Sequence, residues 1–381
     1  MKENNIQDLK LGILGGGQLG RMFIQSAMDY NIDVHILDPD PDAPCKNVAT
    51  SFTVGKLTDY DTVMKFGKDC DILTIEIENV NTEALRALEK EGVRVFPQPD
   101  IIELIKDKRT QKSFYRDHDI PTADFTLVDS KTDIAKLGKF PSVNKLGKEG
   151  YDGRGVQVLR TASDIDKAFD VPGLIEDLVD FEKELAVIVA RNERGECRTF
   201  PVVEMVFHPE ANLVEYLFAP ADVSAEIAKK ADEIARNVID RLGMVGLLAV
   251  EMFLTRDGDI LVNEVAPRPH NSGHQTIEGN ITSQYEQHLR SIFNLPLGDT
   301  SSRAKAAMVN LLGEEGHTGP AFYEGLEKVS AISGVHVHLY GKKLTKPFRK
   351  MGHVTIEEND MELLIEKVQF VKEHLKVISN V

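Results

Sequence analysis

The chain has 381 residues, of which 42% are hydrophobic and 28% charged, and its 45 Lys and Arg against 61 Asp and Glu give a net charge of −16. At roughly 100 to 200 residues per domain, this length predicts two or three domains with a sizeable buried core. The negative charge repels phosphate backbones and anionic lipid, so neither nucleic acid nor a membrane is an expected partner. The polar amino terminus and three scattered cysteines, Cys45, Cys70 and Cys197, favour a cytoplasmic protein without disulfides or structural zinc.

The first 105 residues alternate short apolar strands with helices, which is typical of a parallel β-α-β domain. Residues 9–30 indicate a strand, a glycine turn and a helix. Further strands are predicted at residues 32–40, 71–78 and 93–100, and further helices at residues 58–70 and 81–92.

Residues 101–121 are predicted to form one helix that ends at Ile120 and Pro121. A mixed region follows, with apolar hairpins around residues 140–265 and a helix at 221–242. The last portion has predicted strands at residues 305–313, 334–341 and 352–358 and a helix at 360–376. We therefore expect an α/β chain with boundaries near residues 105 and 298.

A glycine turn lies between the first strand and the first helix. Its six residues fit the pattern G-x-G-x-x-G, with Asp38 about 20 residues further on: Gly15, Gly16, Gly17, Gln18, Leu19 and Gly20. The glycines allow an anion to approach backbone N–H groups at the helix start. A dinucleotide, another phosphate or substrate group, and plain packing of strand on helix all agree with this pattern.

Two acids are predicted to face each other on a hairpin. If Asp257 and Gly258 form a two-residue turn, counting back along both strands places Glu251 opposite Glu264. Facing carboxylates, about 4.5 to 5.5 Å apart, call for a proton or a divalent cation. Oxygen ligands suit Mg²⁺, which usually brings nucleotide phosphates, and Asn263 is a further oxygen donor. The alternative, two solvated acids, disagrees with the apolar residues nearby, Leu247, Leu248, Val250, Phe253 and Val262.

Several weaker signals precede this hairpin. The glycine-rich basic loop at residues 145–155 is either a cover for a triphosphate or a surface turn. The like-charged neighbours of Lys108, which are Lys106, Arg109 and Lys112, usually indicate a solvated helix face. Glu176 and Glu184 flank apolar strands, and either can accept hydrogen bonds from a nucleotide.

The order of these motifs resembles the ATP-grasp enzymes and, within them, the N5-carboxyaminoimidazole ribonucleotide synthetases of purine biosynthesis. The resemblance covers nearly the whole chain and rests on the strings GGGQLGRM, DKRTQK, EGYDGRG, VEMF, NEVAPRPHNSGH and RKMGH. GYDGRG together with NE-APR-HNSGH is specific to this family, whereas the paired acids mark ATP-grasp enzymes in general. The chain departs from the family pattern at Glu149, Val156 and residues 79–81.

This resemblance implies an ATP-grasp fold. It implies a Rossmann-like domain at residues 1–105, an ATP-grasp domain at 106–298 that clamps nucleotide between two mixed sheets, and a small carboxy-terminal domain at 299–381. A lid subdomain would span about residues 110–175. The family also implies a homodimer.

The resemblance assigns a role to each motif. Lys108, Lys145, Asn263 and Glu264 would bind the ATP phosphates, Glu176 the adenine edge and Glu184 the ribose, and Glu251 and Glu264 would hold Mg²⁺, or Mn²⁺ as the alternative. The lid would also bind ATP, through Gly150, Tyr151, Asp152, Gly153, Arg154 and Gly155. The implied catalytic residues are Tyr151, Arg154, Arg268, His270 and Lys350. The implied substrate-binding residues are Gly17, Gln18, Leu19, Glu76, Asn271, Ser272, Lys343, Arg349 and Lys350.

The implied reaction joins ATP, bicarbonate and 5-aminoimidazole ribonucleotide to give N5-carboxyaminoimidazole ribonucleotide, ADP and phosphate. Phosphorylation to carboxyphosphate gives bicarbonate a better leaving group than hydroxide. By residue type, His270 and His274 are candidates for the base that the amine needs. Two rivals are another ATP-grasp ligase, such as a formate-dependent glycinamide ribonucleotide transformylase, and a nucleotide sensor or dehydrogenase that uses the glycine turn.

Residues 340–353 reverse the sign of the chain's charge. They contain five cations and no acid, namely Lys342, Lys343, Lys346, Arg349 and Lys350. A solvated face is one interpretation, and a positive funnel that draws in anionic substrates is the other. In the second, Arg349 and Lys350 reach the site while Lys342 and Lys343 steer.

Overall fold

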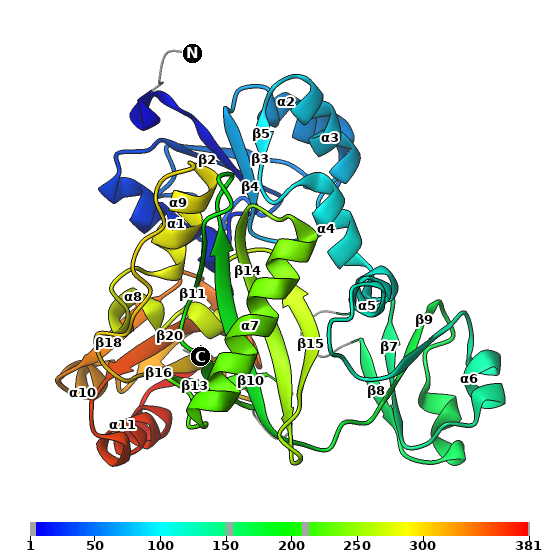
Figure 1. Cartoon of the computed structure of the whole chain (residues 1–381). Helices are drawn as coiled ribbons and strands as arrows, with labels where there is room; N and C mark the ends of the chain where they lie inside the picture. The colour runs from blue at the N-terminus through cyan, green and yellow to red at the C-terminus, as the bar shows by residue number, and fades with distance from the viewer. Residues whose placement is uncertain (1–4, 149, 151–154, 208–212, 380–381) are drawn as a thin grey trace.

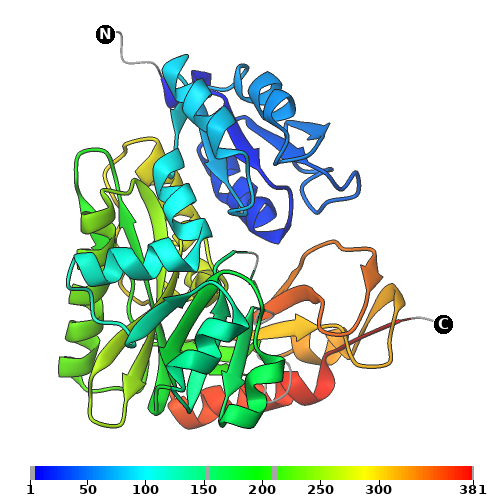
Figure 2. The same ribbon diagram turned by 90° about the vertical axis from the view of Figure 1, so that its right-hand side faces the viewer.

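The computed structural model describes residues 5–148, 150, 155–207 and 213–379. The amino-terminal domain lies above a long central sheet, and a smaller sheet projects to one side (Figure 1). Turned by 90°, the amino-terminal domain still forms a separate layer over the rest (Figure 2). Among the described helices, none is long and apolar enough to cross a membrane.

The amino-terminal domain is a five-stranded parallel sheet in the order β3-β2-β1-β4-β5, which confirms the predicted Rossmann-like arrangement. Its strands are β1 (Leu11–Leu14), β2 (Val34–Asp38), β3 (Ser51–Val54), β4 (Ile72–Ile75) and β5 (Arg94–Val95). Its helices are α1 (Gln18–Asp29), α2 (Tyr60–Gly67) and α3 (Thr82–Lys90), after the short turn η1 (Ile6–Asp8). The edge strand β3 was not predicted, because three of its four residues are exposed and it lacks an apolar pattern.

The prediction of a single helix at residues 101–121 is wrong. The chain instead forms α4 (Pro99–Lys106) and α5 (Lys108–Asp117), separated at Asp107. Asp107 has extended backbone angles, and its carboxylate accepts the Arg109 N–H at 2.9 Å as an N-cap. The Lys108 N–H donates to the Gly147 carbonyl at 2.7 Å, so the break joins α5 to the next sheet.

The projecting body is a four-stranded antiparallel sheet in the order β6-β9-β7-β8. Its strands are β6 (Phe125–Val128), β7 (Ser142–Leu146), β8 (Val156–Leu159) and β9 (Gly173–Asp177). Helix α6 (Lys131–Leu137) and the turn η2 (Ala162–Lys167) pack beside it around a small core that includes Val128, Ile134 and Ile175.

The central sheet has nine strands in the order β15-β14-β10-β12-β13-β16-β20-β18, with β11 paired to β10. The first part comprises β10 (Phe181–Arg191), β11 (Cys197–Thr199), β12 (Val203–Phe207), β13 (Val214–Ala219), β14 (Gly246–Thr255) and β15 (Ile260–Ala266). Helix α7 (Ala225–Leu242) covers one face through a core that includes Ala231, Val187 and Val250. The expectation of two mixed sheets is wrong, because every ladder in both sheets is antiparallel.

The carboxy-terminal strands continue the central sheet. β16 (Ala306–Leu312) pairs with β13, and β20 (Lys350–Glu357) and β18 (Val335–Leu339) follow. Helix α11 (Met361–His374) packs on β16 and β20. The remaining elements are a second small sheet of β17 (Gly319–Glu324), β19 (Leu344–Thr345) and β21 (Lys376–Ser379), and helix α10 (Leu326–Ser330).

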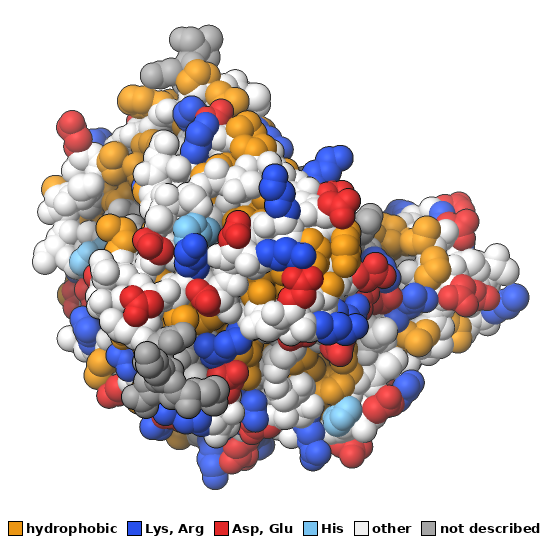
Figure 3. Space-filling view, turned by 90° about the horizontal axis from the view of Figure 1, so that it is seen from above, with side chains coloured by type: hydrophobic (Ala, Val, Ile, Leu, Met, Phe, Trp, Pro, Cys, Tyr) orange, Lys and Arg blue, Asp and Glu red, His pale blue; other side chains and the backbone are white. Residues whose placement is uncertain are grey.

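A loop segment after β15 connects the two parts of the sheet. It contains η3 (Asn271–Gly273), α8 (Thr276–Gly279) and α9 (Gln284–Ile292), and α9 packs against α1 of the amino-terminal domain. Basic and acidic side chains are interspersed over the surface seen from above (Figure 3).

Candidate active site

Glu251 and Glu264 lie opposite each other on β14 and β15, which confirms the predicted pairing. The route to this pairing differs from the two-residue turn. Gly258, at φ +83°, ends a longer turn in which the Gly258 N–H donates to the Thr255 carbonyl at 3.0 Å, and Leu254 pairs with Ile260. A β-bulge between Glu251 and Met252 then adds one residue to β15 and restores the register.

The bulge also determines which side chains face the site. Val262 and Val265 both pack into the core under α7, although residues three apart on a regular strand point to opposite faces. Between them, Asn263 accepts a hydrogen bond from the Lys145 ammonium at 2.8 Å. Asn263 and Glu264 therefore both lie toward the sheet face away from α7.

Each of the two facing acids has a cationic or imidazole partner. The Lys108 ammonium pairs with Glu264, and His270 Nε2 lies 3.1 Å from Glu251 Oε1. Burial would raise the pKa of Glu264, but the Lys108 charge outweighs it and holds this pKa below its ordinary value. Each of the two carboxylates thus has a partner of its own on this sheet face.

Glu184 adds a third carboxylate to the same face. It lies on β10 opposite Phe253, two residues before Ala186, which pairs with Glu251. Residues two apart on a strand share a face. Burial, and then the charge of Glu251, raise the pKa of Glu184 to about 7.

A buried Lys-Glu-Lys cluster stands across from these acids. The Lys112 and Lys145 ammonium groups lie 2.7 Å from the two oxygens of Glu176, and all three side chains are less than 10% exposed. Burial and the nearby Lys145 lower the pKa of Lys112 to about 8, although Glu176 opposes this shift. The interpretation of Lys112 as part of a solvated face is wrong. Lys108 and Lys112 are four residues apart and share the inward face of α5, a spacing that could have revealed the second lysine.

The glycine-rich loop is described only at its two ends. A Cβ on Gly155 would lie 2.3 Å from the Gly150 Cα. The backbone at Gly150 and the backbone at Gly155 therefore approach too closely for a side chain at residue 155. The Leu146 N–H donates to the Gly155 carbonyl at 2.9 Å. The predicted lid residues Tyr151, Asp152, Gly153 and Arg154, and also Glu149, lie outside the described residues.

The segment after β15 carries several of the residues that were predicted to bind the substrates. Arg268 Nε lies 3.0 Å from Glu78 Oε1; Glu78, which the sequence reasoning missed, follows β4 at the carboxyl edge of a parallel sheet, where sites concentrate. Ser272 is fully buried and its Oγ lies 2.9 Å from His270 Nδ1. Asn271 exchanges two amide hydrogen bonds with Asn310, each 2.9 Å long. Ser272 and Asn271 thus position the segment.

The basic residues 342–350 divide between site and surface. The charge of Lys350 acts on the buried His274, as do those of His270 and Arg268. Lys343 pairs with Asp42 at 3.0 Å, and 74% of its side chain is exposed. Arg349 donates to the Leu344 carbonyl at 2.8 Å. No described contact joins Lys343 or Arg349 to Arg268 or His270.

The glycine turn is filled by the chain's own acids. The Glu76 carboxylate accepts from the Gly17 N–H and, at 2.9 Å, from the Leu19 N–H, and Asp38 accepts from the Gly16 N–H at 2.6 Å. Gln18 begins α1 directly behind Gly17. Burial raises the pKa of Glu76, and the backbone N–H groups partly offset this shift. The anion-binding position of the turn is therefore occupied by Glu76.

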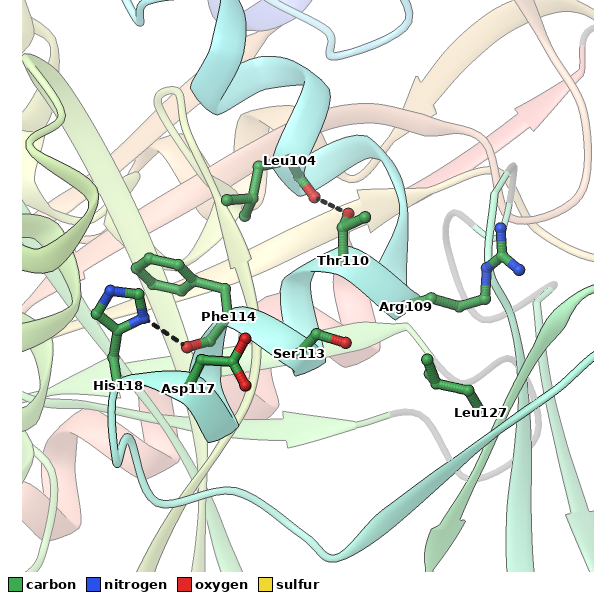
Figure 4. A pocket seen from close by; sticks show the side chains of 8 residues that line it. All are labelled: Leu104, Arg109, Thr110, Ser113, Phe114, Asp117, His118 and Leu127. Carbon is green, nitrogen blue, oxygen red and sulfur yellow. Dashed lines mark hydrogen bonds between the residues drawn. The ribbon is translucent and has the colours of Figure 1, made fainter.

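A surface hollow of about 440 Å³ lies along α5, outside this group of residues. Figure 4 shows its lining, Leu104, Arg109, Thr110, Ser113, Phe114, Asp117, His118 and Leu127. The Thr110 hydroxyl donates to the Leu104 carbonyl at 2.7 Å, and His118 Nδ1 lies 2.9 Å from the Phe114 carbonyl. Of the predicted site residues that the structure describes, none lines this hollow.

Three family models match successive parts of the chain: a ribonucleotide synthetase preATP-grasp domain at residues 9–106, an ATP-grasp domain at 113–285 and a phosphoribosylaminoimidazole carboxylase C-terminal domain at 306–367. The structure is similar to the N5-carboxyaminoimidazole ribonucleotide synthetase from Thermotoga maritima, with a TM-score of 0.91 and 43% identity, over 98% of this chain and 100% of that one. The chain belongs to the N5-carboxyaminoimidazole ribonucleotide synthetase family.

Two other relatives of this synthetase family extend the likeness. The N5-carboxyaminoimidazole ribonucleotide synthase of Synechococcus elongatus is 37% identical over 91% of this chain and 89% of its own length. The N5-carboxyaminoimidazole synthase of Aspergillus clavatus, solved in complex with ADP and 5-aminoimidazole ribonucleotide, has a TM-score of 0.87 and 33% identity, over 96% of this chain and 98% of that one. The ATP-grasp fold and ligase class implied by the sequence motifs are thereby confirmed.

Proposed function

We propose that this chain carboxylates the amino group of 5-aminoimidazole ribonucleotide with ATP and bicarbonate, through carboxyphosphate. The observation that carries the proposal is one sheet face where Glu184, Glu251 and Glu264 stand beside the group of Arg268, His270 and Lys350. His270 links the two sets, since its Nε2 contacts Glu251 and its charge acts on His274 together with those of Arg268 and Lys350. A nucleotide site and an anion site thus share a border, which phosphorylation of bicarbonate requires.

The phosphates of ATP would be held by Lys108 and Lys145, whose ammonium groups lie at the face that carries the carboxylates. Phosphoryl transfer depends on charge neutralisation and alignment more than on covalent help. Glu176 orders Lys112 and Lys145, and a carboxylate has acceptor positions left for the adenine amine. Glu184, which lies on the same sheet face as Glu251, would accept hydrogen bonds from the ribose hydroxyls.

The donor set fits Mg²⁺, with Mn²⁺ as the alternative. Glu251 and Glu264 pair across the hairpin, and the bulge brings the Asn263 amide to the same face. Within the described ranges, no group of three or more His, Cys, Asp or Glu could hold a metal by itself, which agrees with an ion that shares its coordination with phosphates. When bound, the ion neutralises charge that develops in phosphoryl transfer.

The anionic carbon source and the ribonucleotide would bind on the side of Arg268 and Lys350. Glu78 holds the Arg268 guanidinium at 3.0 Å, and Ser272 holds the His270 ring, so the two groups that face the substrates are kept in place. On the amino-terminal side, the turn at Gly17, Gln18 and Leu19 with Glu76 offers acceptors and a carboxylate to the sugar rather than N–H groups to a phosphate.

Further features of the proposal concern the whole chain. We place the domain boundaries at residues 105 and 298, with a lid at about 110–175 that includes Tyr151 and Arg154. We also propose, from the resemblance to the synthetase family, a homodimer that works in the cytoplasm.

The test is an ADP-release assay in which 5-aminoimidazole ribonucleotide, bicarbonate and Mg²⁺ are omitted in turn. We expect release only when all three are present, because carboxyphosphate has no productive fate without an acceptor. Full ATPase activity in bicarbonate-depleted buffer would refute the assignment. Replacing bicarbonate with formate and the ribonucleotide with glycinamide ribonucleotide tests the rival ligase, for which we expect no ADP.

A further inference from the structure

His274 is a buried histidine at the substrate side whose role the proposed function leaves open. It directly follows η3 and is 1% exposed. Its Nδ1 lies 3.0 Å from the Tyr285 hydroxyl and 3.2 Å from Gln284 Nε2. Both partners come from the start of α9, so one edge of the ring is held by that helix.

The orientation of Gln284 is set by the backbone of His270. Gln284 Oε1 accepts the His270 N–H at 2.9 Å, and Gln284 Nε2 donates to the His270 carbonyl at 2.8 Å. If the amide were flipped, Oε1 would face the His270 carbonyl and Nε2 would face the His270 N–H. Two acceptors and two donors would then oppose each other. The amide nitrogen therefore faces His274 Nδ1, and Nδ1 must accept a hydrogen bond. In a neutral ring the proton is then on Nε2.

The surroundings keep this ring neutral. Burial, and then the nearby charges of His270, Lys350, His338 and Arg268, hold the pKa of His274 well below its ordinary value. The ring also packs on His353, with centroids 4.8 Å apart, and His353 stacks on His338 at 4.4 Å. The nearest acid of this column, Glu278, contacts His338 at 2.8 Å rather than His274.

The Nε2–H of His274 has no hydrogen-bond partner among the described residues, whereas Nδ1 has two. Unlike Nε2 of His353, it is not sealed from solvent. Since Nε2 is not among the sealed atoms, a small ligand can reach its N–H and supply the acceptor that the described residues do not.

We propose that His274 is a tautomer-locked, uncharged hydrogen-bond donor to the anion bound by Arg268 and Lys350, and that it is not the base for the amine. This inference rests on the proposed function, since the anion is bicarbonate or carboxyphosphate. A neutral imidazole with its acceptor nitrogen occupied by Gln284 and Tyr285 offers a hydrogen bond without taking a proton from the substrate. Of the two histidines that residue type suggested as the base, only His270 remains.

The test compares two amide substitutions. His274→Asn keeps a polar group near Nδ1 but loses the outer donor, and His274→Gln reaches the position of Nε2 and keeps it. We expect His274→Asn to raise the KM for bicarbonate about 10- to 100-fold, and His274→Gln to recover most of this loss with an unchanged pH profile of kcat/KM. The matched control is His336→Asn, at a half-exposed histidine paired with Glu357, which should leave KM unchanged.

Three outcomes would overturn the inference. They are an equal rise of the KM for bicarbonate in the Gln and Asn variants, an unchanged KM in His274→Asn, and the loss of one of the two pH-dependent slopes of kcat/KM in His274→Gln.

A measurement on the unmodified protein does not depend on the variants. In ¹⁵N NMR of histidine-labelled protein, we expect the His274 proton on Nε2 at every pH between about 6 and 9; a proton on Nδ1, or titration in this range, would refute the inference even if the ADP-release assay succeeds. Failure of that assay would refute the proposed function and leave the NMR result as a separate fact.

Discussion

Glu184 has no ion-pair partner among the described side chains, while Glu251, Glu264 and Glu176 each contact a basic or imidazole group. It is half-buried beside Glu251, so its negative form is disfavoured in the folded protein. A carboxylate whose ionised form is disfavoured in this way, beside other site residues, indicates a functional role rather than a structural one.

We predict that Glu184→Gln stabilises the protein at pH 8. The folded pKa of Glu184, about 7, lies above its ordinary value of 4.5, so the folded state binds this proton more tightly than the unfolded state. The group favours folding at low pH, and that contribution is lost as the pH rises through 7. Removing the charge should therefore raise the free energy of unfolding by about 1 to 3 kcal/mol at pH 8 and change little at about pH 4.5. Thermal midpoints at both values test this, and a less stable variant at pH 8 would contradict it.

Lys112 and Arg116 provide a matched pair on one helix. Lys112 is 3% exposed and paired with Glu176, whereas Arg116 is 62% exposed and paired with its neighbour Asp117. We predict that Lys112→Met lowers the free energy of unfolding by about 1 to 3 kcal/mol, because Glu176 keeps only Lys145. Arg116→Ala should change it by less than about 0.5 kcal/mol. Urea unfolding measures the free energy of unfolding of both variants. Equal changes in the two would show that the buried cluster stabilises the protein no more than the exposed pair does.

At the scale of elements, the glycine turn shows how one pattern can serve a different partner. In a dinucleotide site, the N–H groups at the start of α1 would bind a pyrophosphate. Here Glu76 takes those of Gly17 and Leu19, and a Cβ on Gly17 would lie 2.5 Å from Glu76 Oε1. The glycine is needed for the carboxylate to approach.

We predict that NADH and NADPH do not bind. Displacing Glu76 would leave a buried carboxylate without its hydrogen-bond donors, and a pyrophosphate beside it would add repulsion. Fluorescence titration of the protein with NADH measures this directly, and micromolar affinity would show that Glu76 leaves the turn.

Gly17→Ala should raise the KM for the ribonucleotide and leave the KM for ATP almost unchanged, since the turn lies away from Lys108 and Lys145.

At the scale of the whole molecule, the carboxy-terminal part is continuous with the central sheet. β13 pairs with β16 from Tyr216 opposite Val309 to Ala219 opposite Ala306. The amino-terminal domain contacts α9 through Tyr30 and Glu286 at 3.0 Å and through Thr74 and His288 at 2.9 Å. The segment that carries the proposed substrate-binding residues is therefore joined to the amino-terminal domain through α9.

We predict that a chain ended at residue 304 does not fold to a soluble monomer. The truncation would expose the edge of β13 and the apolar residues Leu217 and Phe218, which β16 and α11 normally help to cover. An unpaired apolar edge promotes aggregation. Size-exclusion chromatography of the truncated chain tests this, and a monodisperse monomer with an intact circular dichroism spectrum would show that the two parts fold independently.

Local patterns in the sequence determined the parallel order of the first domain and the pairing of Glu251 with Glu264. Strand periodicity and turn residues act over a few positions, and an error of one residue at the Gly258 turn was cancelled by the bulge at Asn263. Tertiary structure alone decided that Lys112 is buried, that Glu76 fills the glycine turn and that β16 joins β13. Each of these depends on contacts between residues far apart in the chain, and charge or hydrophobicity at one position does not specify which distant group will neutralise or cover it.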